Sequence, residues 1–324
     1  GNTAVGYTAL TSNTTGVNNT AVGDRACEDH TTGSNITALG TQALTNNTTG
    51  DSNTGLGMQS LLTNTTGGRN VAVGKDALRA NTTADNNTAV GTDALTLNTT
   101  GSGNNAIGAY SLDANTTGGN NIAIGNSALS SNTTANDNVA IGVGAMEANT
   151  TGASNTAVGR GALDVNTTGD ENVAVGYNSL DANTTGTRNT AVGDLSLSSN
   201  IDGEYNIAVG HKALELNTVG RRSTAVGAFA LRTQDPSSSG LMYNSALGYA
   251  ALYSNTTGTQ NTVMGGFSGY LMTTGSGNTS LGYEALYNNT TASNNTAIGN
   301  ASLRANTTGT QNTAVGSACL DANT

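Results

Sequence analysis

Residues 87–103 read Asn-Thr-Ala-Val-Gly-Thr-Asp-Ala-Leu-Thr-Leu-Asn-Thr-Thr-Gly-Ser-Gly, and this 17-residue unit recurs along the whole chain. With the first Asn counted as position 1, the unit starts 19 times, every 17 residues from 2 to 223 and again from 244 to 312. A fixed short period is typical of solenoids, in which each unit packs mainly against its two neighbours. The repeat therefore decides the fold, and each residue is best described by its position in the unit.

Five positions of the unit vary little. Position 1 is Asn in 17 of the 19 copies, position 4 is always apolar, position 5 is always Gly, and position 8 is always Ala, Ser or Cys. Position 9 is Leu except at Cys27, Met146 and Gly269. Charged residues concentrate at positions 6, 7, 10, 11, 16 and 17, which predicts that these positions face solvent.

Each part of the unit has a predicted local structure. Asn-Thr-Ala-Val-Gly predicts a short strand in which positions 2 and 4 share one face and position 3 lies on the other. Positions 6–11 fit either a second short strand or a single helical turn, and we favour the strand. Asn-Thr-Thr-Gly at positions 12–15 predicts a turn, because Asn and Gly accept a left-handed backbone. The Gly at position 5 indicates a bend or a close backbone approach.

Two strands and two turns per unit predict an all-β fold, a parallel β-solenoid or β-roll of 17-residue coils. Equivalent residues would stack, so that Asn at position 1 forms a ladder of side-chain amides. Positions 4 and 9 would supply a thin core, and the small residues at positions 3 and 8 would let another chain approach closely. We expect residues 1–324 to form a single continuous domain, with a loop insertion near residues 234–239 that contains the only proline, Pro236.

Two motifs resemble known fibre proteins. The strands at residues 138–142 and 172–176, Asn-Val-Ala-Ile-Gly and Asn-Val-Ala-Val-Gly, resemble the strand motif of YadA-like trimeric autotransporter adhesin heads, although the unit here is longer. The Ala-Leu-x-x-Asn-Thr-Thr-Gly stretches resemble repetitive tail-fibre and surface-fibre proteins of phages and bacteria. The resemblance covers essentially the whole chain. It implies a homotrimeric, left-handed parallel β-roll that acts as a fibre or adhesive stalk.

Together these patterns predict a structural, non-enzymatic fibre subunit outside the cell, on a cell or virion surface, with an adhesive or spacer role. Its expected partners are further copies of the chain, as a homotrimer or an end-to-end filament, and a cell-surface or glycan receptor. Because the sequence starts and stops within a unit, we expect it to be a window of a longer fibre protein. The alternative is an ice-binding β-solenoid with Thr and Asn ladders, although adjacent Thr residues at positions 13 and 14 would point to opposite faces of a strand.

Charge and motif content disfavour other classes of function. The net charge of −10 and 11 scattered basic residues disfavour nucleic acid and anionic membrane as partners, and we expect no membrane insertion. We expect no catalytic, cofactor or metal site, because acidic residues keep no fixed position and the two histidines lie over ten coils apart. His30 and His211 are predicted to be isolated surface residues, and Cys27 and Cys319 to be buried free thiols.

Two sets of residues are candidate carbohydrate sites. Tyr at position 6 offers a sugar-binding face of irregular spacing, at Tyr7, Tyr177, Tyr249 and Tyr283. Asn-Thr-Thr at positions 12–14 matches the N-glycosylation acceptor pattern, although turn chemistry alone also explains it. The candidate acceptors are Asn13, Asn47, Asn64, Asn81, Asn98, Asn115, Asn132, Asn149, Asn166, Asn183, Asn255, Asn289 and Asn306.

Overall fold

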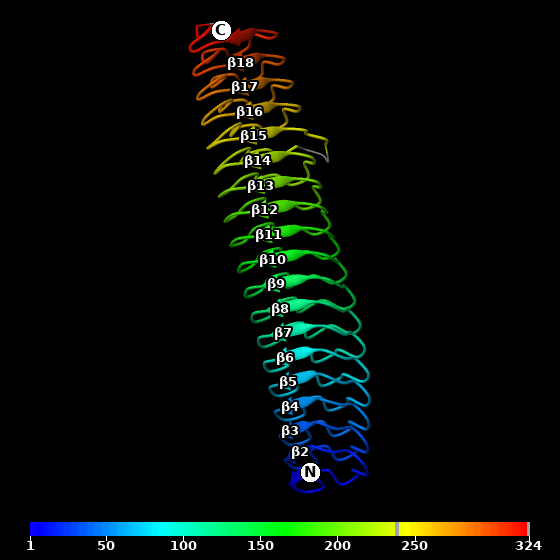
Figure 1. Ribbon diagram of the computed structural model, residues 1–324. Coiled ribbons are helices and arrows are strands. Elements are labelled where there is room, and N and C mark those ends of the chain that lie inside the picture. Colours follow the sequence, from blue (N-terminus) through cyan, green and yellow to red (C-terminus); the bar gives the residue numbers. More distant parts are fainter. Residues whose placement is uncertain (237–239, 323–324) are drawn as a thin grey trace. The chain divides into compact units, whose positions relative to one another are not determined.

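The computed structural model describes residues 1–236 and 240–322 and confirms an all-β, parallel β-solenoid of 17-residue coils. No helix occurs within these described ranges. The contacts divide the chain into two compact units, residues 1–160 and 161–324, which are described separately. In each unit the strands lie one above the next (Figure 1). The single continuous domain stays a prediction.

Each coil contributes one three-residue strand, formed by positions 2–4, and neighbouring strands pair in parallel without a register shift; Thr88, for example, pairs with Asn105 and Ala89 with Ala106. Unit 1 contains β1 (Thr3–Val5), β2 (Thr20–Val22), β3 (Thr37–Leu39), β4 (Thr54–Leu56), β5 (Val71–Val73), β6 (Thr88–Val90), β7 (Asn105–Ile107), β8 (Ile122–Ile124), β9 (Val139–Ile141) and β10 (Thr156–Val158). Unit 2 contains β11 (Val173–Val175), β12 (Thr190–Val192), β13 (Ile207–Val209), β14 (Thr224–Val226), β15 (Ser245–Leu247), β16 (Thr262–Met264), β17 (Thr279–Leu281), β18 (Thr296–Ile298) and β19 (Thr313–Val315).

The strand turns its small residue inward, which corrects the predicted core. Ala89 at position 3 is fully buried, whereas the apolar residue at position 4 lies outside; Ile107 is 41% and Leu247 44% exposed. Positions 2 and 4 do share a face, as predicted, but that face is the outer one. Apart from the first and last coils, the small residues at positions 3 and 8 are buried inside the coil, so they offer no surface to another chain.

The width of the coil explains this choice. The core consists of Ala at position 3, Ala or Ser at position 8 and Leu at position 9. At Gly55, which replaces the position 3 Ala, an added Cβ would lie 2.9 Å from Ser60 Oγ and 3.2 Å from Leu44 Cδ1. The Leu side chain thus already fills the space opposite the strand, and a second branched side chain there would overpack the core.

Positions 6–11 form a series of turns, so the predicted second strand is wrong. Asp93 and Leu95, at positions 7 and 9, have left-handed φ values of 55° and 54°. Ala94 and Leu95 are both fully buried, and adjacent residues of a strand could not both point inward. Residues at position 17, such as Asn86, are also left-handed with φ near 60°, whereas the Asn and Gly of positions 12 and 15 are not.

The Gly at position 5 is required by both conformation and space. Its φ lies between +128° and +143° in every coil, a region that side chains disfavour. A Cβ on Gly91 would also lie 2.5 Å from the carbonyl oxygen of Gly108, its equivalent in the next coil. The predicted bend with close backbone approach is therefore confirmed.

Two buried Asn ladders connect the coils. At position 1, the Asn104 backbone N–H donates to Asn87 Oδ1 at 2.9 Å, and Asn104 Nδ2 donates to the Gly118 carbonyl at 2.9 Å. This ladder confirms the predicted role of position 1. At position 12, Asn98 Nδ2 donates to Asn81 Oδ1 at 3.1 Å, and Asn115 Nδ2 donates to Asn98 Oδ1 at 2.8 Å. This second ladder was not predicted from the sequence.

The coil that starts at Asn261 fills its core with side chains of different sizes from those of the other coils. Gly269 replaces the Leu of position 9, and a Cβ there would lie 3.6 Å from both Val263 Cγ2 and Met272 Cε. Val263 and Met272 stand at positions 3 and 12, where Ala and Asn are usual, and together they fill the missing volume. The cost is a broken ladder, because Met272 cannot donate to Asn255 Oδ1, which has no hydrogen-bond partner in the described ranges.

The predicted insertion at 234–239 lies partly outside the described residues, which omit 237–239. At the start of this range, the buried Gln234 occupies position 12 and extends the ladder, with Nε2 donating to Asn217 Oδ1 at 3.0 Å. Its Oε1 accepts from Ser223 Oγ at 3.1 Å and from Asn244 Nδ2 at 2.9 Å. The side chain of Gln234, which is one methylene longer than that of Asn, therefore bridges two coils that the insertion separates in sequence.

Candidate functional site

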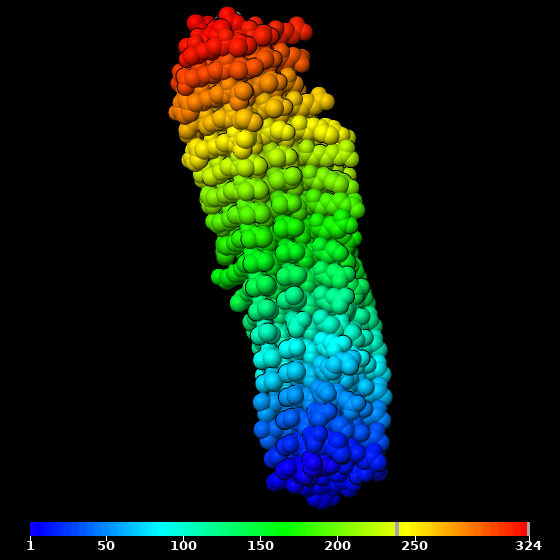
Figure 2. Space-filling view, viewed as in Figure 1, coloured from blue at the N-terminus to red at the C-terminus, as the bar shows by residue number. Residues whose placement is uncertain are grey.

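Because the coils stack in register, the residues of each outward-facing position form a row along the stack. A candidate site is therefore a group of neighbouring rows. Figure 2 shows these tiers, with aligned side chains on the surface of each unit. The outer strand face, formed by positions 2 and 4, carries no charged residue in any of the 19 strands that the structure describes. It contains Val, Ile, Leu or Met at position 4 and mostly Thr, Val or Ile at position 2. The repeat therefore creates an uncharged face in each unit.

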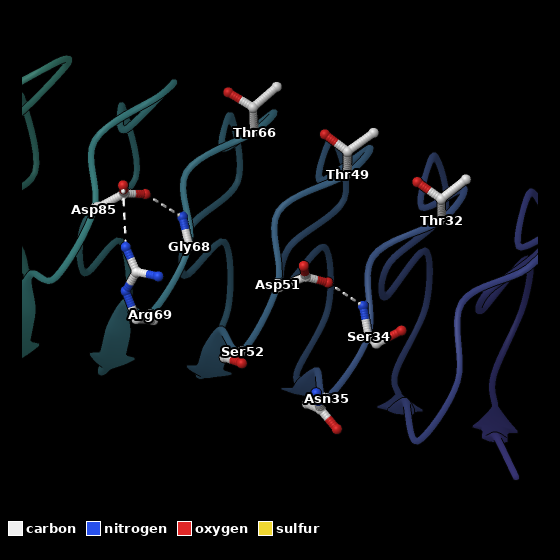
Figure 3. Close-up of a pocket in the computed structure, with 10 residues that line it drawn as sticks. All are labelled: Thr32, Ser34, Asn35, Thr49, Asp51, Ser52, Thr66, Gly68, Arg69 and Asp85. Carbon is white, nitrogen blue, oxygen red and sulfur yellow. Dashed lines mark hydrogen bonds and ion pairs between the residues drawn. The ribbon is translucent and has the colours of Figure 1, made fainter.

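A second candidate is a polar groove on unit 1, about 600 Å³ in volume (Figure 3). On one side, Thr32, Thr49 and Thr66, at position 14 of three successive coils, point the same way. On the other side lie side chains of positions 16 and 17. The lining residues are Thr32, Ser34, Asn35, Thr49, Asp51, Ser52, Thr66, Gly68, Arg69 and Asp85.

The charged side chains in this groove already have partners within the chain. Asp51 Oδ1 accepts from the backbone N–H of Ser34 at 2.6 Å, and Asp85 Oδ1 accepts from that of Gly68 at 2.7 Å. Arg69 Nη2 lies 3.4 Å from Asp85 Oδ2. The carboxylates thus satisfy backbone groups of the preceding coil, and no metal-binding group of three or more His, Cys, Asp or Glu occurs in the residues described. The groove can offer hydroxyl and carboxylate oxygens to a polar ligand.

The candidate glycosylation residues lie in the buried ladder of position 12. Twelve of the 13 are fully buried, and Asn13 is partly exposed. In Asn64, for example, Nδ2 donates to Asn47 Oδ1 at 2.6 Å and to the Gly67 carbonyl at 2.9 Å. Glycosylation would require the same nitrogen, and the packed coil leaves no room for a glycan at these twelve positions. We therefore assign the Asn of Asn-Thr-Thr a structural role.

The two histidines differ in position. His211 is exposed, and its Nδ1 lies 3.1 Å from Asp194 Oδ2. His30 is fully buried, so its prediction as a surface residue is wrong. It replaces Asn at position 12, with Nε2 2.7 Å from the Gly33 carbonyl and Nδ1 2.9 Å from Asn47 Nδ2. An imidazole protonated at Nε2 satisfies both contacts, which places His30 in the ladder as a substitute for Asn.

The two cysteines are free, and only Cys27 is buried as predicted; Cys319 is partly exposed. Burial raises the pKa of the Cys27 thiol to about 12. Since the unfolded thiol has an ordinary pKa of 9.0, the protonated thiol stabilises the fold below pH 9, and this contribution is lost as the pH rises towards 12.

We predict that Cys27 resists alkylation in the folded chain. At pH 8 a thiol with a pKa of about 12 has a thiolate fraction roughly a thousandfold below that of a thiol with the ordinary value, and only the thiolate reacts. The Cys319→Ser variant makes Cys27 the only thiol, so labelling with iodoacetamide can be followed by mass spectrometry with and without denaturant. Rapid labelling of the folded variant would contradict the burial of Cys27.

The four tyrosines of position 6 are all exposed, but they do not form one row. Tyr7 is in unit 1 and Tyr177 is in unit 2, and neither ring contacts another aromatic ring in the part of the chain that the structure describes. Tyr249 and Tyr283 belong instead to a larger group of rings that draws on positions 6, 7 and 10. The sequence pattern at position 6 alone did not reveal this group.

Comparisons with known proteins provide no family assignment. The described part of the chain contains no helix that could span a membrane. No protein-family model matches the chain, and no curated protein matches it.

Proposed function

We propose that the chain is a structural, non-enzymatic subunit of an extracellular fibre on a cell or virion surface, in which copies associate through their outer strand faces. The observation that carries this proposal is the row of outward-facing apolar residues at position 4, which are exposed or half-buried and are not interrupted by a polar residue in either unit. Val5, Ile107 and Ile141 are 58%, 41% and 37% exposed. Adhesion or spacing is the role that such a fibre would serve, and a cell-surface or glycan receptor would be its partner.

The size and chemistry of this face support association. With ten strands about 4.8 Å apart, each about 10 Å long, the face of unit 1 measures roughly 500 Å². The position 4 row is the apolar part of this face, beside mostly Thr at position 2, and apolar patches of a few hundred Å² on soluble proteins are often functional. Because every coil repeats the same outward side chains, the face of one copy matches the spacing of another, and two such sheets can interdigitate about 10 Å apart. A homotrimer is the arrangement that the resemblance to adhesin heads implies.

We predict that charge on the outer strand face prevents assembly. The variant with Ile107→Lys, Ile124→Lys and Ile141→Lys places three like charges on adjacent strands of β7–β9, where packing against another copy would bury them without partners. The expected result is smaller particles in sedimentation velocity, with an unchanged circular dichroism spectrum, because these side chains lie outside the core.

The matched control places the same three charges on another surface of the same coils. Thr117→Lys, Thr134→Lys and Thr151→Lys change exposed residues at position 14, and this variant should assemble like the parent chain. A parent chain that remains monomeric at concentrations of about 100 μM, well above the Kd of ordinary stable interfaces, would contradict the proposal.

Ice binding is the second candidate, and the exposed Thr row of position 14 favours it. Three of its hydroxyls point the same way from successive coils in Figure 3, whereas the hydroxyls of position 13 donate to the next coil, as Thr48 Oγ1 does to the Thr65 carbonyl at 3.0 Å. The same variants separate the two functions. If the chain binds ice, the triple Thr variant loses inhibition of ice recrystallisation and the triple Ile variant retains it.

A further inference from the structure

Unit 2 contains a concentration of aromatic residues that the repeat does not explain. Both phenylalanines of the chain and five of its ten tyrosines lie on four successive coils, at positions 6, 7 and 10. In most other coils these positions are polar or charged, as at Asp24, Arg25 and Glu28. We call this group the aromatic face; it consists of Phe229, Tyr249, Tyr253, Phe267, Tyr270, Tyr283 and Tyr287.

The column at position 10 is closed. The rings of Tyr253 and Tyr270 stack at 5.1 Å and 22°, and those of Tyr270 and Tyr287 at 5.3 Å and 16°. At the two ends, the guanidinium groups of Arg232 and Arg304 lie 5.6 Å and 5.7 Å from the terminal ring centroids. Both faces of every ring in this column therefore have a partner, and the column stabilises adjacent coils.

The column at positions 6 and 7 begins at the ring of His211, whose centroid lies 5.2 Å from that of Phe229, and it is more open than the column at position 10. Phe229 meets Tyr249 edge to face at 85°, Tyr249 meets Phe267 at 70°, and Phe267 meets Tyr283 at 87°. An edge-to-face contact covers the face of only one ring of each pair, so ring faces remain uncovered along the column. Tyr249 is accordingly 52% and Tyr283 51% exposed.

A hollow of about 210 Å³ lies between the two columns, lined by Phe229, Tyr249, Ala250, Tyr253, Phe267 and Tyr270. No charged residue lines it. The charged groups at its borders are paired, with Arg232 Nε 2.5 Å from Glu215 Oε2 and Arg304 Nε 2.6 Å from Glu284 Oε2. The hydroxyls of Tyr249 and Tyr270 form no hydrogen bond within the described ranges, so they are available to a ligand.

We propose that the aromatic face binds a linear, neutral oligosaccharide that lies along the coil stack; this deepens the adhesive role proposed above. A sugar ring combines an apolar C–H face with a rim of hydroxyls, which matches the apolar body and polar tip of Tyr. The absence of unpaired charge at the hollow disfavours nucleotides and acidic glycans. The volume is below the ~300–1,000 Å³ of drug-sized sites, which suits one ring of a longer chain. Tyr249 and Tyr283 lie two coils apart, about 10 Å, which is the span of two linked sugar rings.

The test is isothermal titration calorimetry of the full chain with three neutral hexasaccharides: cellohexaose, maltohexaose and the hexamer of N-acetylglucosamine. We expect at least one of them to bind, and Tyr249→Ala to weaken its binding by about tenfold through loss of one ring contact. Tyr249→Phe should retain most of the affinity, because the ring remains. Since Tyr249 is half exposed, neither change should alter the circular dichroism spectrum.

Tyr110→Ala is the matched control, because Tyr110 is also half exposed but lies in unit 1, outside the aromatic face. It should leave the affinity unchanged. Failure of all three sugars to bind at about 1 mM, or equal weakening by Tyr110→Ala and Tyr249→Ala, would overturn the proposal. Sedimentation of the same samples keeps the two proposals distinguishable: a chain that assembles without binding sugar refutes this one alone, and a monomer that binds sugar refutes the fibre alone.

Discussion

Replacing Gly91 with Ala should destabilise its coil by about 3 kcal/mol or more. The φ of +140° alone costs an L residue on the order of 1–3 kcal/mol. In addition, the new Cβ would lie 2.5 Å from the Gly108 carbonyl oxygen, so adjacent coils must separate and weaken the parallel hydrogen bonds on both sides. Hydrogen exchange measured by mass spectrometry should show lost protection in the strands β5–β7, because a solenoid can open locally.

Gly50→Ala is the matched control, with the same added methyl group in the same unit. A Cβ at Gly50 would also approach its neighbours, including Asn47 Oδ1 at 2.5 Å and the Gly67 carbonyl. However, Gly50 stands at position 15, where φ is not left-handed and where Ala84, Ala135 and Ala292 occur naturally. The control should therefore lose no more than about 1 kcal/mol. Equal loss of protection in both variants would show that crowding alone, without the left-handed backbone, governs position 5.

Replacing Asn98 with Ala should cost about 3 kcal/mol. The change removes the donor to Asn81 Oδ1 and to the Gly101 carbonyl, and the acceptor of Asn115 Nδ2. All of these groups are buried, and each buried polar atom left without a partner costs on the order of 1–3 kcal/mol. Urea unfolding of the parent and variant measures the difference.

Asn126→Ala is the control for this prediction, since Asn126 is exposed and, within the described ranges, its side chain makes one hydrogen bond, accepted from the neighbouring Ser127 Oγ at 3.2 Å. Its free energy of unfolding should change by less than about 0.5 kcal/mol. If Asn98→Ala were as mild as the control, the ladder at position 12 would contribute little, and the Asn of Asn-Thr-Thr would need another explanation.

The sequence predicted the features of the fold that depend on repetition. A 17-residue period allows equivalent residues to stack, so the strand at positions 2–4, the Asn ladder at position 1 and the close approach at Gly91 and its equivalents followed without knowledge of the coil shape. The adjacent Ala94 and Leu95 also held a usable signal: two neighbouring positions that are small and apolar in most units cannot both face the core of a strand. That signal indicates the turns at positions 6–11.

Other features depended on the closed path of the coil. Whether Ile107 or Ala106 points inward is decided by the Leu side chain that already fills the space opposite the strand. The alternation along three strand residues does not indicate which of the two faces is buried. The burial of Asn64 and His30 likewise follows from position 12 lying inside the bend. The hollow beside Tyr249 forms because positions 6, 7 and 10 of neighbouring coils adjoin.

The amino-acid sequence by itself thus determined the period, the strand and the stacking, because these depend only on spacing along the chain. The tertiary structure decided which residues of each strand face the core, since the narrow coil has room for Ala at position 3 but not for Val beside the Leu of position 9. That choice leaves the apolar residues of position 4 on the outside, and with them the surface on which the proposed assembly depends.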